Sequence, residues 1–267
     1  MRPNTLKQRI RDNQPIVSAW LSIPSGYSAE ILARQGFDCV NVDLQHGMIG
    51  FDHAVPMLQA ISATDAIPIV RVGNSEPAAM MKLLDAGAYG VICPMISNVE
   101  DAQTFVSACR YPPHGNRSFG PARGLLYGGA DYAKHANDEI LTIGMIETRE
   151  GLDNVDAIAA VDGLDGLFIG PNDLSLALGK APMAEPTDPE VVAAIAKILE
   201  AAQNQAKVAG IFCSSPAAAA KRIAQGFGFV VPGNDAGMLT QAGRNAVAGA
   251  RANPAADAGN TKGGSGY

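Results

Sequence analysis

The sequence predicts a single eight-stranded β/α barrel with a parallel sheet, on three observations. Short apolar runs rich in Val and Ile alternate with longer amphipathic patterns, which is typical of parallel strands covered by helices. There are eight such units, the number that closes a barrel. No Gly-x-Gly-x-x-Gly segment follows the first run, which argues against an open, nucleotide-binding sheet.

Each predicted strand is a short, continuous apolar run. Most runs are followed by helical periodicity, and Gly36, Gly87 and Gly226 stand where a helix C-cap favours glycine. We expect strands at residues 16–23, 37–43, 67–72, 90–94, 140–147, 166–170, 208–213 and 227–232. We expect helices at residues 28–35, 51–63, 77–86, 99–109, 149–160, 189–205, 216–225 and 236–251, and one starting near Asp173.

Two segments lack this regularity. Residues 111–137 are rich in Gly, Pro and Tyr, and we expect an irregular loop there. Residues 252–267 are rich in Ala, Gly and Asn. They are expected to form a disordered tail, whose Gly-Gly-Ser-Gly-Tyr ending is typical of an added linker. The predicted catalytic barrel therefore occupies residues 1–251.

The composition argues against several classes of partner. The chain has 267 residues, 47% hydrophobic and 17% charged, with a formal net charge of −6. An acidic chain without a Lys/Arg run is a poor partner for nucleic acid or an anionic membrane. No run approaches the ~20 apolar residues that span a bilayer. An anionic small substrate remains compatible, because local charge can oppose net charge.

The cysteines and the N-terminal segment both favour a cytoplasmic protein. Cys39, Cys93, Cys109 and Cys213 form no Cys-x-x-Cys pair, and we expect buried thiols in a reducing compartment. Residues 1–14 are polar and basic and lack the apolar stretch of a secretory signal.

Polar residues at the ends of the predicted strands are the candidate functional groups. Catalytic side chains of β/α barrels lie at these ends or in the loops that follow. Because parallel strands end at the same rim, we expect these side chains to converge. They are Asp43, His46, Arg71, Glu147, Asp173 and Ser214.

Glu147 and Asp173 are the candidate metal ligands. They follow adjacent predicted strands, and two carboxylates completed by waters and substrate oxygens suit a hard divalent cation. An acid that ends an apolar strand needs a cation nearby, so contact with a metal or an arginine explains Glu147 better than surface exposure does. Asp173 alone would be explained equally well as a helix N-cap.

Arg71, Asp43 and His46 are the candidate catalytic residues. The guanidinium of Arg71 can bind a carboxylate or stabilise an enolate oxygen, and the alternative is an ion pair with a neighbouring acid. Asp43 can hold one imidazole nitrogen of His46 and leave the other as a base. No lysine ends a predicted strand, which disfavours a Schiff-base mechanism.

The turn after the sixth predicted strand is a candidate substrate site. Its backbone N–H groups open a helix, where they can bind a substrate carboxylate. The residues predicted to contact substrate are Arg71, Gly170, Asn172, Asp173 and Ser214.

Taken together, these residues resemble the HpcH/HpaI aldolase family, in particular its class II, 4-hydroxy-2-oxoheptanedioate aldolase type. The likeness runs in the same order from about residue 5 to residue 250. It includes Asp-Leu-Gln-His-Gly and Gly-Pro-Asn-Asp-Leu-Ser motifs. The matching segments are residues 43–47, 70–72, 85–94, 115–120, 145–151 and 165–175.

The resemblance implies a (β/α)₈ barrel, usually a hexamer built from dimers that exchange a helix. It implies an aldolase that uses Mg²⁺, Mn²⁺ or Co²⁺ to join a pyruvate-type 2-oxo acid to an aldehyde, or to cleave the product. By this likeness Glu147 and Asp173 bind the metal, His46 with Asp43 transfers protons, and Arg71 stabilises the enolate.

Two positions depart from the family pattern. Gln45 stands where many relatives have Glu, and Met145 where many have Gln, which predicts an altered donor or acceptor preference. Two other reactions stay open on the same barrel: decarboxylation of a 2-oxo acid and cleavage of an acyl-CoA ester. We also expect residues 111–137, through Arg123 and Tyr127, to shape the aldehyde site, either of the same chain or across a subunit boundary.

Overall fold

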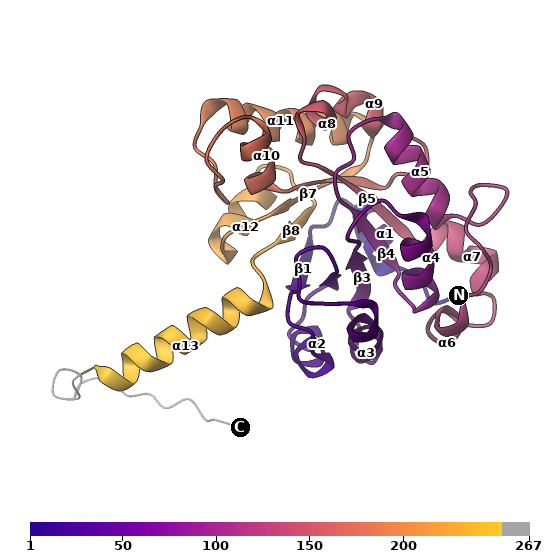
Figure 1. Cartoon of the computed structure of the whole chain (residues 1–267), viewed down its shortest axis with the longest axis horizontal. Helices are drawn as coiled ribbons and strands as arrows, with labels where there is room; N and C mark the ends of the chain where they lie inside the picture. The colour runs from indigo at the N-terminus through magenta and orange to yellow at the C-terminus, as the bar shows by residue number, and fades with distance from the viewer. Residues whose placement is uncertain (253–267) are drawn as a thin grey trace.

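The structure, a computed structural model, describes residues 1–252 and contains a closed barrel of eight parallel strands (Figure 1). The strands pair in chain order, and β8 pairs with β1 to close the ring. The predicted barrel is thereby confirmed. The strands are β1 (Ile16–Leu21), β2 (Cys39–Asp43), β3 (Ile67–Arg71), β4 (Gly90–Cys93), β5 (Leu141–Ile146), β6 (Gly166–Ile169), β7 (Val208–Phe212) and β8 (Phe229–Val231).

Helices follow the strands and surround the barrel (Figure 1). None of those in residues 1–252 has both the length and the apolar character needed to cross a membrane. The helices are α1 (Thr5–Arg11), α2 (Gly26–Ala33), α3 (Phe51–Ser62), α4 (Pro77–Asp85), α5 (Val99–Cys109), α6 (Ala122–Gly128), α7 (Tyr132–Glu139), α8 (Arg149–Asp153), α9 (Val155–Ala159), α10 (Pro171–Ala177), α11 (Pro189–Asn204), α12 (Pro216–Ala224) and α13 (Asp235–Arg251).

The prediction of an irregular loop at residues 111–137 is wrong in part, because α6 and most of α7 lie there. Long-range contacts of a buried arginine order this segment. The Arg117 guanidinium lies over the ring of Tyr111 at 4.4 Å and the ring of Tyr132 at 5.4 Å. It also donates to Asp85 on α4 at 2.8 Å. Such contacts between elements leave no periodic pattern in the sequence.

Aromatic side chains pack across the interior of the barrel. The Trp20 ring stacks on Phe168 and meets Phe212 edge-on, with ring centres 5.7 Å apart in both pairs. A glycine makes room for this packing, because a Cβ at Gly210 would lie 2.5 Å from the Phe168 ring. All three aromatic residues line a cavity at the carboxyl end of the strands, so they form its floor.

Helix α13 projects away from the barrel that the other helices surround (Figure 1). Its one buried residue is Asp235, whose carboxylate accepts the backbone N–H groups of Ser22 at 2.8 Å and Ile23 at 3.1 Å. These bonds tie the first turn of α13 to the loop after β1. The tail predicted at residues 252–267 lies, from residue 253 onward, outside the described part of the chain.

Candidate active site

A cavity of about 370 Å³ opens at the carboxyl ends of the barrel strands. Six residues predicted from the sequence lie on its wall: Asp43, His46, Arg71, Gly170, Asn172 and Asp173. The other lining residues are Trp20, Ser22, Met145, Phe168, Pro171, Phe212 and Asn234.

Glu147 is not itself among the residues that line this cavity, but the register between β5 and β6 places it beside Gly170, which does line it. The pair Ile146 and Ile169 is the last in that register, so Glu147 and Gly170 follow as the next residues on neighbouring strands. Glu147 is only 4% exposed. Its Oε1 accepts the backbone N–H of Met95 at 2.9 Å, and its Oε2 lies beside Gly170, in the cavity wall.

The carboxylates of Glu147 and Asp173 converge on the backbone of Gly170. A Cβ placed on Gly170 would lie 2.9 Å from Glu147 Oε2 and 3.4 Å from Asp173 Oδ2. Both oxygens therefore border a single small gap, which exists because residue 170 has no side chain. The structure thus brings the two side chains to one point of the backbone, and their role as metal ligands stays a prediction.

The electrostatics of this gap favour a cation. Burial raises the pKa of Glu147; the Met95 N–H opposes that change, and the negative charge of Asp173 adds to it. Two acids this close are stable in their charged forms only when a positive charge compensates them.

The residues around the gap fit a hard divalent metal ion. Carboxylate oxygens are the ligands that Mg²⁺ and Mn²⁺ prefer, and Mg²⁺ commonly uses one or two of them together with waters and substrate oxygens. No cluster of three or more His, Cys, Asp or Glu side chains suited to a metal exists within residues 1–252. A metal held by Glu147 and Asp173 would thus keep open positions for substrate.

Asp43 and Arg71 form a buried, bidentate ion pair on the opposite side of the cavity. Arg71 Nε donates to Oδ1 at 2.8 Å and Nη2 donates to Oδ2 at 2.5 Å. The indole N–H of Trp20 also donates to Asp43 at 3.1 Å, and the guanidinium lies 4.8 Å from the Trp20 ring. Burial by itself would raise the pKa of Asp43, but hydrogen bonds and charge from Arg71 outweigh it and lower this pKa.

One edge of the Arg71 guanidinium remains available for substrate. Within residues 1–252 the one hydrogen-bond partner of its Nη1 is the Met145 thioether, at 4.0 Å, and a thioether is a weak acceptor. Because Asp43 fixes the other edge, Nη1 can donate to an oxygen in the cavity without any rearrangement.

The expected side-chain pair between Asp43 and His46 is absent from the described part of the chain. Asp43 Oδ1 instead accepts the backbone N–H groups of Gln45 at 3.0 Å and His46 at 3.2 Å. With both carboxylate oxygens also bound to Arg71, no oxygen of Asp43 is directed at the imidazole. Asp43 therefore positions Arg71 and the turn after β2, while His46 lines the cavity separately.

Ser214 is not brought to the cavity. Its hydroxyl and its backbone N–H both donate to Glu185 Oε1, at 3.1 Å and 3.0 Å. Glu185 also pairs with Arg222 at 3.4 Å. Phe212, the last residue of β7, lines the cavity instead.

Arg123 and Tyr127 lie at the opposite end of their own barrel. Arg123 donates to the carbonyl oxygen of Ala86 at 2.8 Å and to the hydroxyl of Ser62 at 2.9 Å. These partners stand where α4 and α3 end, next to the starts of the following strands. Arg123 and Tyr127 therefore lie away from the cavity of their own chain, and a contribution of this segment across a subunit boundary stays a prediction.

Several lining residues were not predicted from the sequence, because they are not polar residues at the ends of predicted strands. Trp20 resembles an ordinary core aromatic, and its contacts with Asp43 and Arg71 depend on the closed barrel. Ser22 and Asn234 come from loops at the two ends of the chain, and Asn234 donates to the Ser22 hydroxyl at 3.3 Å. The proximity of β1 and β8 in a barrel is the signal that would have paired them.

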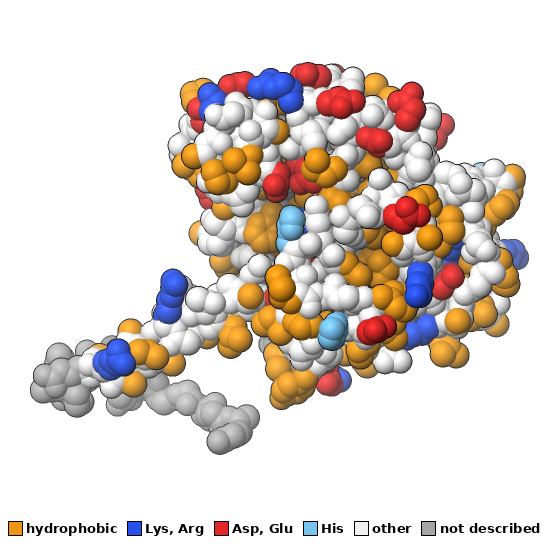
Figure 2. Space-filling view, viewed as in Figure 1, with side chains coloured by type: hydrophobic (Ala, Val, Ile, Leu, Met, Phe, Trp, Pro, Cys, Tyr) orange, Lys and Arg blue, Asp and Glu red, His pale blue; other side chains and the backbone are white. Residues whose placement is uncertain are grey.

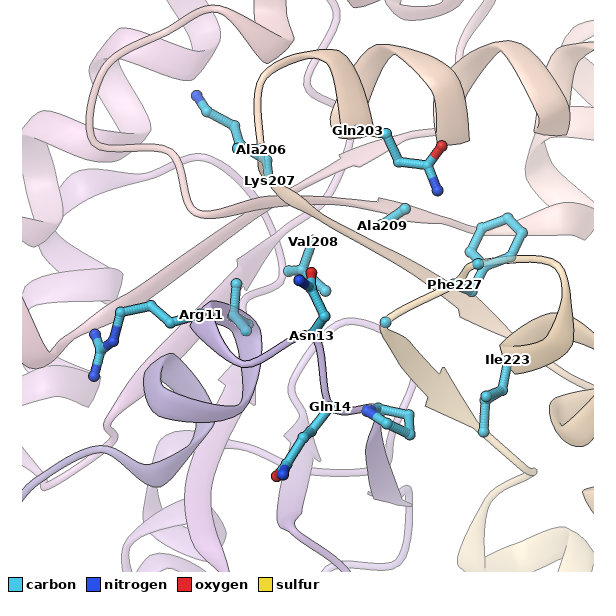
Figure 3. Close-up of a pocket in the computed structure, with 14 residues that line it drawn as sticks. Arg11, Asn13, Gln14, Gln203, Ala206, Lys207, Val208, Ala209, Ile223 and Phe227 are labelled. Atoms are coloured by element: carbon cyan, nitrogen blue, oxygen red, sulfur yellow. The ribbon is translucent and has the colours of Figure 1, made fainter.

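A larger cavity, of about 780 Å³, lies where strands β7 and β8 begin (Figure 3). Its wall combines apolar groups such as Phe227 with the amides of Asn13 and Gln203. In Figure 3 the charged ends of Arg11 and Lys207 point away from its centre, and the Lys207 ammonium is bound to a backbone carbonyl. No acidic or basic side chain of its lining points into it, so this cavity is not the candidate active site although it is the larger of the two.

A β/α barrel with acids, an arginine and a histidine converging at the strand ends defines an enzyme that acts on a small polar molecule. The chain belongs to the HpcH/HpaI aldolase/citrate lyase family, whose sequence profile matches residues 17–242. It is an aldolase, a lyase that makes or breaks a carbon–carbon bond.

The relatives span nearly the whole chain. A hydroxypyruvate/pyruvate aldolase of Rhizorhabdus wittichii is 45% identical over 249 residues, 93% of this chain and 99% of the relative. A 5-keto-4-deoxy-D-glucarate aldolase of an Enterobacter species is 36% identical over 242 residues, 90% and 94% of the two chains. A solved HpcH/HpaI aldolase/citrate lyase family protein of Burkholderia cenocepacia is 34% identical with a TM-score of 0.88, covering 93% of this chain and 100% of its own.

Replacing Asp43 with Asn should destabilise the fold at neutral pH by about 3 kcal/mol, because Arg71 stays buried without a counter-charge. The lowered pKa of Asp43 means that its contribution is present above the ordinary carboxyl range and is lost as pH falls through the folded-state pKa. Urea unfolding of the wild type and the variant should therefore give free energies that converge between about pH 5 and pH 2.

The exposed Asp156 on α9 offers a control, since Asp156→Asn removes a carboxylate without breaking a buried pair. An Asp43→Asn difference that stays constant from neutral to acid pH would contradict the role given to the ion pair.

Proposed function

We propose that the cavity binds a pyruvate-type 2-oxo acid, converts it to its enolate and adds that enolate to an aldehyde, or runs the same reaction in reverse. One observation carries this proposal: the Glu147 and Asp173 carboxylates converge on Gly170, in the wall of a cavity that Arg71 and His46 also line.

The donor is proposed to be pyruvate or hydroxypyruvate. The name of the Rhizorhabdus wittichii relative, a hydroxypyruvate/pyruvate aldolase, supports this choice. A cavity of about 370 Å³ suits a small donor and a small aldehyde, since ligand sites start at about 300 Å³.

Glu147 and Asp173 would hold Mg²⁺, Mn²⁺ or Co²⁺, and the bound ion would polarise the donor carbonyl as a Lewis acid. Backbone N–H groups of Asn172 and Asp173 are available to the donor carboxylate, because Leu174 is the first residue of α10 to donate back, to the Gly170 carbonyl.

Two side chains of the cavity carry out the remaining steps, which are charge stabilisation and proton transfer. Arg71 Nη1, held in place by Asp43, donates to the donor oxygen as negative charge develops on it. The imidazole of His46 takes a proton from the donor C3. The C3 carbon then bonds to the aldehyde carbon, and the new alkoxide takes up a proton, which His46 can return. No lysine lines the cavity, in keeping with a mechanism without a Schiff base.

We also propose that the protein works in the cytoplasm as a hexamer built from three dimers, each of which exchanges α13 between its two chains. The free, buried cysteines 39, 93, 109 and 213 support a reducing compartment. Leu239 and Val247 on α13 are 65% and 50% exposed, and Figure 2 shows hydrophobic side chains along this projecting helix. A second copy of the chain would bury this surface.

The aldolase reaction is tested by the entry of deuterium into the methyl group of pyruvate, followed by NMR in D₂O with and without Mn²⁺. We expect exchange that requires the metal and falls about 100-fold or more in Arg71→Lys, because one donor to the developing charge is lost. Arg149→Lys, a surface residue paired with Glu190, is the matched control.

An aldehyde panel then identifies the products. Release of CO₂ from a 2-oxo acid without aldehyde would indicate decarboxylation, and turnover of an acyl-CoA ester alone would indicate the other open reaction. Metal-independent exchange at the wild-type rate would contradict the proposed mechanism.

Replacing Gly170 with Ala should weaken Mn²⁺ binding by about 10-fold or more. The new Cβ would lie only 2.9 Å from Glu147 Oε2, so this oxygen has to move away from its position at the metal site. Titration of free Mn²⁺ by electron paramagnetic resonance measures this affinity without substrate. Gly50→Ala is the control, since its Cβ would meet nothing nearer than 3.9 Å. Equal affinities in the two variants would place the metal elsewhere.

Light scattering tests the role of α13. The wild type should have the mass of a hexamer, and a double variant, Leu239→Asp with Val247→Asp, should form smaller species because charges oppose burial of this surface. Gln241→Glu adds a charge elsewhere on the helix and should leave the mass unchanged. A wild type with the mass of a monomer would contradict the proposed hexamer.

A further inference from the structure

The orientation of Glu147 depends on a single backbone group. Within residues 1–252 the one hydrogen bond to its carboxylate comes from the N–H of Met95 at 2.9 Å, although the side chain is only 4% exposed. This bond engages Oε1 and leaves Oε2 at the gap beside Gly170. Whatever fixes the direction of the Met95 N–H therefore fixes the oxygen that faces the cation.

The backbone of Met95 adopts an unusual conformation. Its φ is +59°, in the left-handed region that residues with a Cβ disfavour. Two other non-glycine residues of the described chain share this region, Asn13 and Ala206, and each directly follows a helix C-cap. Met95 follows strand β4, so helix capping does not account for its conformation.

Hydrogen bonds on both sides hold this turn in place. The N–H of Ile96 donates to the Met145 carbonyl at 3.1 Å. The Ser97 hydroxyl donates to the Met95 carbonyl at 3.2 Å and shares a bond of 2.9 Å with the Thr148 hydroxyl. These bonds join the turn to Met145 and Thr148, on either side of Glu147 in the chain, whereas the Met95 side chain is 55% exposed.

We propose that Met95 is a positioning residue for the metal site. Its left-handed backbone directs the N–H at Glu147 Oε1, and thereby directs Oε2 at the metal. Sterically unfavourable backbone of this kind is maintained at functional sites when surrounding bonds determine it. The inference rests on the proposed metal-binding role of Glu147, and it assigns no contact with substrate to Met95.

The competing explanation is that the exposed Met95 side chain matters as an apolar part of the rim. Leucine and isoleucine separate the two explanations, because they are isomers of similar size and hydrophobicity. Isoleucine is branched at Cβ and strongly resists a positive φ, whereas leucine resists it no more than methionine does. Glycine adopts this φ freely but removes the side chain.

The test is the Mn²⁺ affinity of the full chain without substrate, measured by electron paramagnetic resonance. We expect Met95→Leu and Met95→Gly to bind within about threefold of the wild type, and Met95→Ile to bind about 10-fold more weakly or worse, as for other residues that orient a metal ligand. Aldolase turnover of Met95→Ile should recover as Mn²⁺ is raised, which a general loss of structure would not allow.

Equal affinities in the leucine and isoleucine variants would overturn the inference, and so would a glycine variant as weak as isoleucine. If Met95→Ile does not fold, the comparison of glycine with leucine still decides between backbone and side chain. A wild type that binds no Mn²⁺ would instead refute the metal site itself, and the positioning role with it.

Discussion

Two carboxylates of like charge border the gap at Gly170, and the mouth of the barrel is organised around this electrostatic constraint. Burial raises the pKa of Glu147 and the charge of Asp173 raises it further. The arrangement is stable at neutral pH when a cation shares both oxygens. The same absence of a Cβ that lets the acids approach also leaves room for that cation. The backbone at Gly170 therefore determines both how close the two acids lie and how strongly they attract a cation.

The β2–β3 side of the mouth has the opposite character, because its charges are already compensated. The register pairs Asp43 directly with Arg71, and two hydrogen bonds fix the guanidinium. A fixed positive group then faces the gap across the cavity, at no cost of reorganisation when negative charge develops on substrate. The guanidinium also lies against the buried Trp20 ring, and charge interactions are stronger in such low-dielectric surroundings.

Much of this arrangement follows from periodicity. Alternating runs predict the barrel, and the barrel brings strand ends such as Arg71 and Glu147 to one rim. Which partner each group selects does not follow, since Asp43 had two candidates, His46 and Arg71, and only the register between β2 and β3 decides between them. Ser214 shows the same limit, because a loop residue, Glu185, binds it away from the cavity. The left-handed backbone conformation of Met95 cannot be predicted from the residue types around it.

The thioether of Met145 explains how Arg71 keeps a free donor. The resemblance to the family places glutamine at this position in many relatives, and an amide oxygen there would be a strong acceptor for Nη1. Sulfur at 4.0 Å fills the same space, also beside the gap at Gly170, yet competes weakly with a substrate oxygen. Gln45 is the other departure, and its Oε1 is buried without a partner in the described chain. Met145 thus sets the polarity beside Arg71, and Gln45 that of the turn after β2, while the carboxylates of Glu147 and Asp173 keep their places.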